Sequence, residues 1–247
     1  MIEIKDISKS FTDSFGYKIE LFENVSFEII KNRITTIVAP SGTGKTSLLR
    51  IIAGLEIPSA GEIVNKGESV IFIPSESSSF PWLTTKENIQ LALINKDKNL
   101  FDEIIKLIGL EGYEDHYANN LSLGYRFRIS LARSIIRKPS LIVIDEPFNK
   151  MDELTKLELY ILLRKIIENI PLTFLFTTTN ISEAVFLSDH IFLMQKNPGR
   201  IVDNIDIQSS LIRDENTFSL KEFKEHRLYI EEKYKSIDSQ KLVNISI

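Results

Sequence analysis

Apolar and polar residues alternate at the start of the chain. The alternation runs through Ile2–Ile7 and again through Ile19–Ile29, with turn-forming residues at 13–16 between the two stretches. A period of two is typical of strands that bury one face. The pattern therefore predicts a pair of N-terminal antiparallel strands.

Farther along, short runs of consecutive apolar and β-branched residues replace the alternation. Such runs are typical of strands that are buried on both faces of a parallel sheet. They are Ile34–Val38, Val70–Ile73, Leu141–Ile144, Thr173–Phe176 and Ile191–Met194. Apolar residues at helical spacing occur at Lys45–Ala53, Thr155–Ile167 and Glu183–Leu187. Strands that alternate with helices predict an α/β fold with a doubly wound parallel sheet.

The stretch from residue 75 to residue 138 has a different pattern. A serine-rich loop at 75–79 is followed by helical spacing at Thr84–Leu93 and Leu100–Ile108, and no strand pattern interrupts it. One more amphipathic helix is predicted near the end of the chain, over Leu220–Tyr234. We therefore expect an α/β core of residues 1–74 and 139–206, an inserted helical subdomain of residues 75–138, and a helical tail of residues 207–247.

Composition narrows the possible functions. The 247 residues include 30 lysines and arginines against 34 aspartates and glutamates, so bulk positive charge gives no support to nucleic-acid binding. The absence of cysteine excludes disulfides, thiolate zinc sites, iron–sulfur clusters and cysteine nucleophiles. The charged N-terminus is unlike a signal peptide, and no uncharged apolar run approaches the roughly 20 residues that cross a bilayer. We expect a soluble chain that meets a membrane only through a partner.

The loop after the first buried strand carries a phosphate-binding pattern. Residues 39–46 read APSGTGKT, which fits G-x-x-x-x-G-K-[ST] except that Ala39 replaces the first glycine. A positive φ at Ala39 would cost on the order of 1 kcal/mol. Glycines let backbone N–H groups turn toward phosphates, and the following helix adds its positive N-terminal end. Lys45 is expected to reach the β- and γ-phosphates, and the Thr46 hydroxyl to ligate magnesium. The expected nucleotide-binding residues here are Pro40, Ser41, Gly42, Thr43, Gly44, Lys45, Thr46 and Ser47.

A second motif follows the buried strand at Leu141–Ile144. Two carboxylates, Asp145 and Glu146, come directly after this uncharged run. Ligands of open α/β sheets bind at the carboxyl ends of the strands, so both side chains are expected beside the phosphate loop. Asp145 is expected to hold Mg²⁺ through water, and Glu146 to accept a proton from the water that attacks ATP. The predicted fold is therefore a P-loop NTPase core, a mixed sheet flanked by helices, with antiparallel N-terminal strands and the inserted helical subdomain.

Together with these motifs, residues 121–133 resemble the ATP-binding subunits of ABC transporters, and the resemblance covers nearly the whole chain. The segment LSLGYRFR at 121–128 is similar to the family signature LSGGQ-x-x-R. Phe80–Thr84 and Asn197–Val202 resemble the nitrate, sulfonate, taurine and aliphatic-amine importer branch in particular.

This resemblance implies a head-to-tail dimer, homomeric or heteromeric, in which each ATP lies between one subunit's phosphate loop and the other's signature. Ser122 and Gly124 would contact nucleotide across the interface. Phe11 matches the residue that stacks on adenine, although a half-buried strand residue is the alternative interpretation. The pair would dock beneath transmembrane permease subunits, peripheral on the cytoplasmic face of the membrane, and an extracytoplasmic solute-binding protein would act indirectly.

Beyond Ala39, three elements depart from the family pattern: the γ-phosphate-sensing glutamine, the switch histidine and the signature. Ser75 stands where the family has a glutamine that senses the γ-phosphate, and Thr179 stands at the switch histidine. In the signature, Leu123 replaces a glycine whose N–H approaches the opposing γ-phosphate, and Tyr125 replaces a glutamine or methionine. Loss of one such contact commonly costs about 10²–10⁴ in rate.

Two functional hypotheses follow from these departures. In the first, the chain is an ATPase subunit that energises solute import. In the second, it is a degenerate ATP-binding partner that hydrolyses slowly and pairs with a better-equipped subunit. A non-transport ABC protein acting in DNA repair or translation is the weaker third alternative. His190 is expected to be structural, and packing inside the helical segment is the favoured interpretation of Trp82, with exposure at a docking surface as the alternative.

Overall fold

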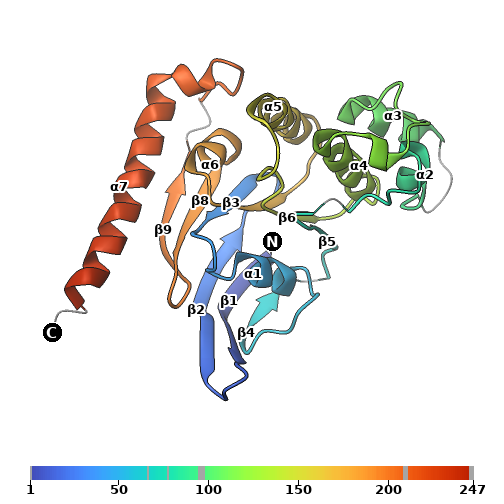
Figure 1. Ribbon diagram of the computed structural model, residues 1–247. Coiled ribbons are helices and arrows are strands. Elements are labelled where there is room, and N and C mark those ends of the chain that lie inside the picture. Colours follow the sequence, from blue (N-terminus) through green and yellow to red (C-terminus); the bar gives the residue numbers. More distant parts are fainter. Residues whose placement is uncertain (1, 66, 77, 94–97, 208–210, 245–247) are drawn as a thin grey trace.

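Two sheets form the core of the molecule (Figure 1). The computed structural model describes residues 2–65, 67–76, 78–93, 98–207 and 211–244. The smaller sheet is antiparallel, in the order β2-β1-β4. Its strands are β1 (Ile2–Thr12), β2 (Lys18–Ile29) and β4 (Ala60–Val64). The predicted pair of N-terminal antiparallel strands is thus present.

The larger sheet has six strands in the order β5-β6-β7-β3-β8-β9. The first five run parallel and β9 is antiparallel to β8, so the sheet is mixed, as predicted. Every residue of β3, β6 and β7 is buried, which explains their uninterrupted apolar runs. The strands are β3 (Ile34–Val38), β5 (Val70–Ile73), β6 (Leu141–Asp145), β7 (Phe174–Thr178), β8 (His190–Gln195) and β9 (Arg200–Asp206).

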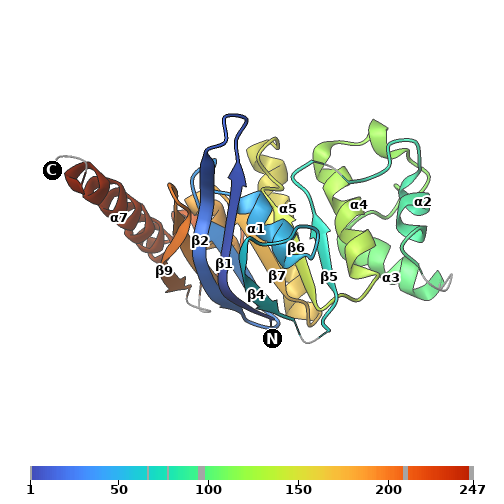
Figure 2. The ribbon, with the colours of Figure 1, turned by 90° about the horizontal axis from the view of Figure 1, so that it is seen from below.

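Helices cover both faces of the larger sheet (Figure 2). Side chains alternate along a strand, so Leu141 and Val143 of β6 pack with α1 (Lys45–Ile52) and the small sheet, while Ile142 and Ile144 pack on the opposite face. That opposite face is covered by α5 (Glu153–Asn169) and α6 (Ile181–Leu187). The helix α1 and the phosphate loop before it therefore lie between the two sheets.

Within the described part of residues 75–138 the regular elements are all helical. They are α2 (Thr85–Gln90), α3 (Lys98–Ile108), the 3-10 turn η1 (Ala118–Asn120) and α4 (Leu123–Ile135). The helix α2 begins one residue after the predicted start, because Thr84 caps it in a reciprocal capping box with Glu87, and it ends at Gln90, before the predicted Leu93. The helices lie together at one end of the molecule (Figure 1). The exact division into core, subdomain and tail stays a prediction.

The C-terminal part adds the 3-10 turn η2 (Thr217–Ser219) and the long helix α7 (Lys221–Asn244). The helix α7 extends beyond the predicted end at Tyr234. Its residues Phe223 and Ile230 are buried against the rest of the molecule, and Tyr234 Oη donates a hydrogen bond to the carbonyl of Val38, the last residue of β3. None of the described helices combines the length and the apolar character that a bilayer crossing requires.

Two strands, β4 and β9, were not predicted from the sequence. The residues of β4 are exposed or half-buried, and those of β9 alternate between exposed and half-buried over most of its length. Both strands lie at an edge of their sheet, where few side chains enter the core. An apolar pattern is therefore too weak there to indicate a strand.

Candidate functional site

The phosphate loop joins β3 to α1 and presents an uncapped helix end. Gly42 and Gly44 have φ of +81° and +95°, a conformation that favours glycine. A Cβ at Gly44 would also lie 2.6 Å from Leu21 Cγ of β2. No side chain caps the start of α1, and its first turn holds no acidic residue. The free N–H groups and the helix dipole can therefore face an anion.

Ala39 occupies the first position of this loop without strain. It is buried, its N–H donates to the carbonyl of Thr178 at 3.2 Å, and it is not among the described residues that have a positive φ. The glycine of the consensus pattern is therefore not needed for backbone conformation here.

Lys45 is a buried cation that is fully engaged. Its side chain lies beneath the loop, where Nζ donates to the carbonyls of Ala39 and Pro40 at 2.9 and 3.1 Å. The same Nζ lies 2.7 Å from Glu146 Oε1. A buried ammonium requires such partners, and the pairing brings the loop lysine and the expected catalytic carboxylate into direct contact.

The two residues expected to hold magnesium are also in contact. Thr46 Oγ1 donates to Asp145 Oδ2 at 2.7 Å, and Thr177 Oγ1 donates to Asp145 Oδ1 at 2.7 Å. A hydroxyl and a carboxylate are the hard oxygen ligands that Mg²⁺ prefers, usually together with substrate phosphates and water. The described residues contain no cluster of three or more His, Cys, Asp or Glu side chains suited to a metal ion. The donor set fits a magnesium ion that arrives with a nucleotide.

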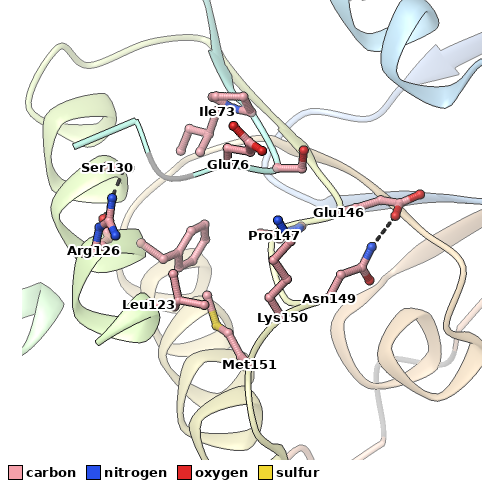
Figure 3. Close-up of a pocket in the computed structure, with 13 residues that line it drawn as sticks. Ile73, Glu76, Leu123, Arg126, Ser130, Glu146, Pro147, Asn149, Lys150 and Met151 are labelled. Atoms are coloured by element: carbon pink, nitrogen blue, oxygen red, sulfur yellow. Dashed lines mark hydrogen bonds between the residues drawn. The ribbon is translucent and has the colours of Figure 1, made fainter. Parts of the chain in front are cut away.

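Glu146 follows directly at the end of β6, in an unusual conformation. Its φ is +40°, and its N–H donates to the carbonyl of Thr177 on the neighbouring strand at 3.1 Å. Asn149 Nδ2 donates to its Oε2, the oxygen that does not contact Lys45 (Figure 3). Both carboxylate oxygens are therefore held by side chains.

A cavity of 410 Å³ opens beside Glu146 (Figure 3). Ser75 and Leu123, which belong to two of the three departing elements, line it together with Glu146. The third, Thr179, is exposed just after β7 and is not among the lining residues. The cavity therefore collects residues from the end of β5, from α4 and from the loop after β6 around one carboxylate.

The other predicted site residues do not line this cavity. Phe11 is 48% exposed and lies opposite Ile19 in the β1–β2 pair. Ser122 is exposed at the start of α4, while Gly124 is buried where a Cβ would lie 2.6 Å from Thr155 Cγ2. The small size of Gly124 thus has a packing reason within this chain, and the nucleotide contacts of these three residues stay predictions.

Sequence reasoning missed Gly199 as a residue that supports the site. A Cβ there would lie 2.8 Å from the carbonyl oxygen of Thr43 in the phosphate loop. The Gly199 N–H donates to Leu21 O, and the Gly199 carbonyl accepts from Glu23 N–H. These two hydrogen bonds hold the turn against β2 beside the phosphate loop. The glycine was visible within Asn197–Val202, but no local pattern indicates which segment it meets.

Trp82 is 68% exposed, so the favoured interpretation that it packs inside the helical segment is wrong. The reason is that buried Asn88 holds the preceding turn: it accepts from Phe80 N–H at 2.8 Å and donates to the carbonyl of Leu83 at 3.2 Å. The backbone of the turn is closed by these hydrogen bonds, and the indole is directed outward.

The histidine at the start of β8 has a structural partner. His190 Nδ1 lies 2.5 Å from Asp206 Oδ1 of β9. This contact joins two paired strands, in agreement with the expected structural role.

Comparisons with known proteins agree with this geometry. The ABC transporter family profile matches residues 22–149. The aliphatic sulfonates import ATP-binding protein SsuB of Bacillus anthracis is 35% identical over 90% of this chain and 92% of the relative. The uncharacterized ABC transporter ATP-binding protein MJ0412 of Methanocaldococcus jannaschii is 32% identical over 93% of this chain and 90% of the relative.

Solved structures of ABC transporter cassettes are also similar to this chain. The dimeric structure of MJ0796, described as a bacterial ABC transporter cassette, has a TM-score of 0.73 and 25% identity, and the match covers 85% of this chain and 100% of the cassette. A post-hydrolysis state of the same cassette, bound to ADP and Pi, matches equally well. The fold of this chain is therefore shared with a cassette whose structure was determined with ADP and Pi bound.

Proposed function

Because the chain belongs to the ABC transporter family, as an ATP-binding ATPase subunit of the sulfonate and nitrate importer branch, we propose that it binds Mg–ATP at a dimer interface and drives solute import by permease subunits. The observation that carries this proposal is the uncapped start of α1 beside the Thr46–Asp145 contact. It supplies free N–H donors for phosphates and hard oxygens for magnesium in one place.

In this proposal the loop residues 40–47 cradle the phosphates, and Lys45 turns from Glu146 toward the β- and γ-phosphates. Thr46 and Asp145 would hold magnesium, which would offset phosphate charge. Glu146 takes a proton from a water whose oxygen bonds to the γ-phosphorus, while the bond from that phosphorus to the bridging oxygen of ADP breaks. ADP and phosphate leave. Positioning and electrostatics supply nearly all of the rate in such reactions.

The proposed assembly contains a second ATP-binding subunit and two permease subunits on the cytoplasmic face of the membrane. Ser122 and Gly124 would then contact the nucleotide held by the partner, and Phe11 would stack on adenine. The relatives named SsuB serve the import of aliphatic sulfonates. In this chain no solute site is proposed, because the permease and the solute-binding protein would select the solute.

Nucleotide binding is tested by substitution of the loop lysine. Lys45→Ala is expected to abolish equilibrium binding of a fluorescent ATP analogue, because the variant loses the cation that meets the phosphates. Lys221→Ala, which removes a lysine with a 90% exposed side chain at the start of α7, serves as the control and is expected to bind as the wild type does. Unchanged affinity in Lys45→Ala would remove this loop from the nucleotide site.

The second candidate function is the degenerate ATP-binding partner. Its support is that Ser75 and Leu123 lie in one cavity with Glu146, and that Thr179 cannot supply the positive charge of a histidine. In this alternative the chain closes on ATP, and a separate subunit with the complete set of residues performs most of the turnover.

A further inference from the structure

The Glu146 carboxylate is held at both of its oxygens by different kinds of donor. Lys45 Nζ contacts Oε1. Asn149 Nδ2 donates to Oε2, and this hydrogen bond is drawn in Figure 3. We propose that Asn149 is a positioning residue for ATP hydrolysis, which aims the Glu146 carboxylate at the attacking water. This inference rests on the proposed function of Glu146 as the base.

The loop that carries Asn149 is anchored on both sides. Phe148, the residue before it, is 1% exposed, and its ring packs edge-on against Phe127 and Tyr160. At the other end, Asp152 caps α5 by accepting hydrogen bonds from the Thr155 N–H and hydroxyl at 2.9 and 2.7 Å. Asn149 therefore projects from a fixed backbone, although its own side chain is exposed.

The Asn149 amide can restrain the Glu146 carboxylate during catalysis, whereas Lys45 cannot. In the proposed mechanism Lys45 turns toward the phosphates, and its contact with Oε1 is then lost. Asn149 remains as a neutral donor to Oε2. Its NH₂ group must face the carboxylate, because its carbonyl oxygen would be repelled there. A carboxylate that is restrained through one oxygen keeps the other free to accept a proton.

The strained backbone of Glu146 supports the same role. A non-glycine residue at φ +40° persists only where its surroundings hold it. The Glu146 N–H is bound to β7, and its side chain is bound to the loop after β6 through Asn149. Thr179, at the switch-histidine position, is exposed and lies outside the cavity. The task of holding the Glu146 carboxylate therefore falls to the Asn149 amide.

Two substitutions separate positioning from simple packing. Asn149→Ala removes the donor and the volume, whereas Asn149→Asp keeps the shape but replaces the donor with a carboxylate oxygen that repels Glu146. Both are expected to lower kcat by about 10–100-fold, a size typical of small misplacements of a reacting group. KM for ATP is expected to stay within about twofold. Asn169→Ala, which removes an exposed asparagine at the end of α5, is the matched control and should turn over as the wild type does.

A double-mutant cycle then tests whether Asn149 acts through Glu146. Phosphate release is measured under single-turnover conditions in the wild type, Asn149→Ala, Glu146→Gln and the double variant, with binding of the ATP analogue measured in each. In the Glu146→Gln background Asn149→Ala is expected to change the rate by less than about twofold, because residues that act as a unit are non-additive.

Two results would overturn the inference while the proposed function stands. They are wild-type kcat in Asn149→Asp and a full additive loss in the double variant. Failure of the proposed function would instead appear as loss of ATP-analogue binding by the wild type, or as a wild-type rate no higher than that of Glu146→Gln, and the inference would then fall with it.

Discussion

Glu183 is a buried carboxyl group next to the proposed site. It lies in the first turn of α6 and is 4% exposed, and Tyr160 Oη donates to its Oε2 at 3.2 Å. Burial raises the pKa of Glu183 to about 7, while hydrogen bonds from Thr178 and Tyr160 act in the opposite direction. In the unfolded chain a glutamate titrates near pH ~4.3. Between these pH values only the folded state holds the proton, so this contribution to stability is full below pH ~4.3 and is lost as the pH rises through about 7.

We therefore expect Glu183→Gln to stabilise the protein at alkaline pH. The amide keeps a hydrogen-bonding group and cannot ionise, so the gain in the free energy of unfolding should be roughly 1–3 kcal/mol near pH ~8.5 and close to zero near pH ~4.5. Urea unfolding of both proteins at the two pH values measures it. Glu225→Gln, on the surface of α7, is the control. An equal difference at both pH values would contradict the assigned titration.

At the scale of elements, the turn before α2 exposes the aromatic ring of Trp82. Asn88 is fully buried and ties this turn to the start of the helix, and the Arg133 guanidinium lies 4.8 Å from the centre of the Phe80 ring. The exposed Trp82 ring lies 5.5 Å from that of Phe80. Trp is enriched among the residues that contribute most to protein–protein binding.

Trp82→Ala is accordingly expected to weaken attachment to the permease subunits while ATP binding stays unchanged. The measurement is co-expression with the permease genes, followed by pull-down from membranes and quantification of this chain. Ile57→Ala, which removes another strongly exposed apolar side chain, provides the comparison. Equal recovery of both variants would place the docking surface elsewhere.

At the scale of the whole molecule, the three departures from the family pattern come from separate elements. Ser75 follows β5, Leu123 begins α4, and Thr179 follows β7. In a homodimer each site would combine Ser75 and Thr179 of one subunit with Leu123 of the other, so both sites would be impaired. In a heterodimer the defects would be divided between two unlike sites.

The triple change Ser75→Gln, Leu123→Gly and Thr179→His is therefore expected to raise steady-state phosphate release of the purified protein by at least about tenfold, since single contacts of this kind are commonly worth more. Glu146→Gln supplies the blank. Brisk hydrolysis by the wild type, with no gain from the triple change, would count against the degenerate-partner alternative.

The sequence by itself determined the elements whose cause is local. The β-branched runs that became β3, β6 and β7 are buried on both faces, so their composition alone indicates the strand. The phosphate loop was equally predictable, because glycines at positions 42 and 44 indicate a positive φ, which other residues rarely adopt. Asp145 and Glu146 could be assigned to the same edge because parallel strands end together.

Only the tertiary structure decided the features that depend on residues far apart in the chain. The contact of Lys45 with Glu146, the fit of Gly199 against the Thr43 carbonyl and the exposure of Trp82 all arise where separate segments meet. The edge strand β9 likewise takes its conformation from pairing with β8 rather than from its own pattern. A period or a motif reports which backbone a segment prefers, whereas packing decides which partner each side chain finds.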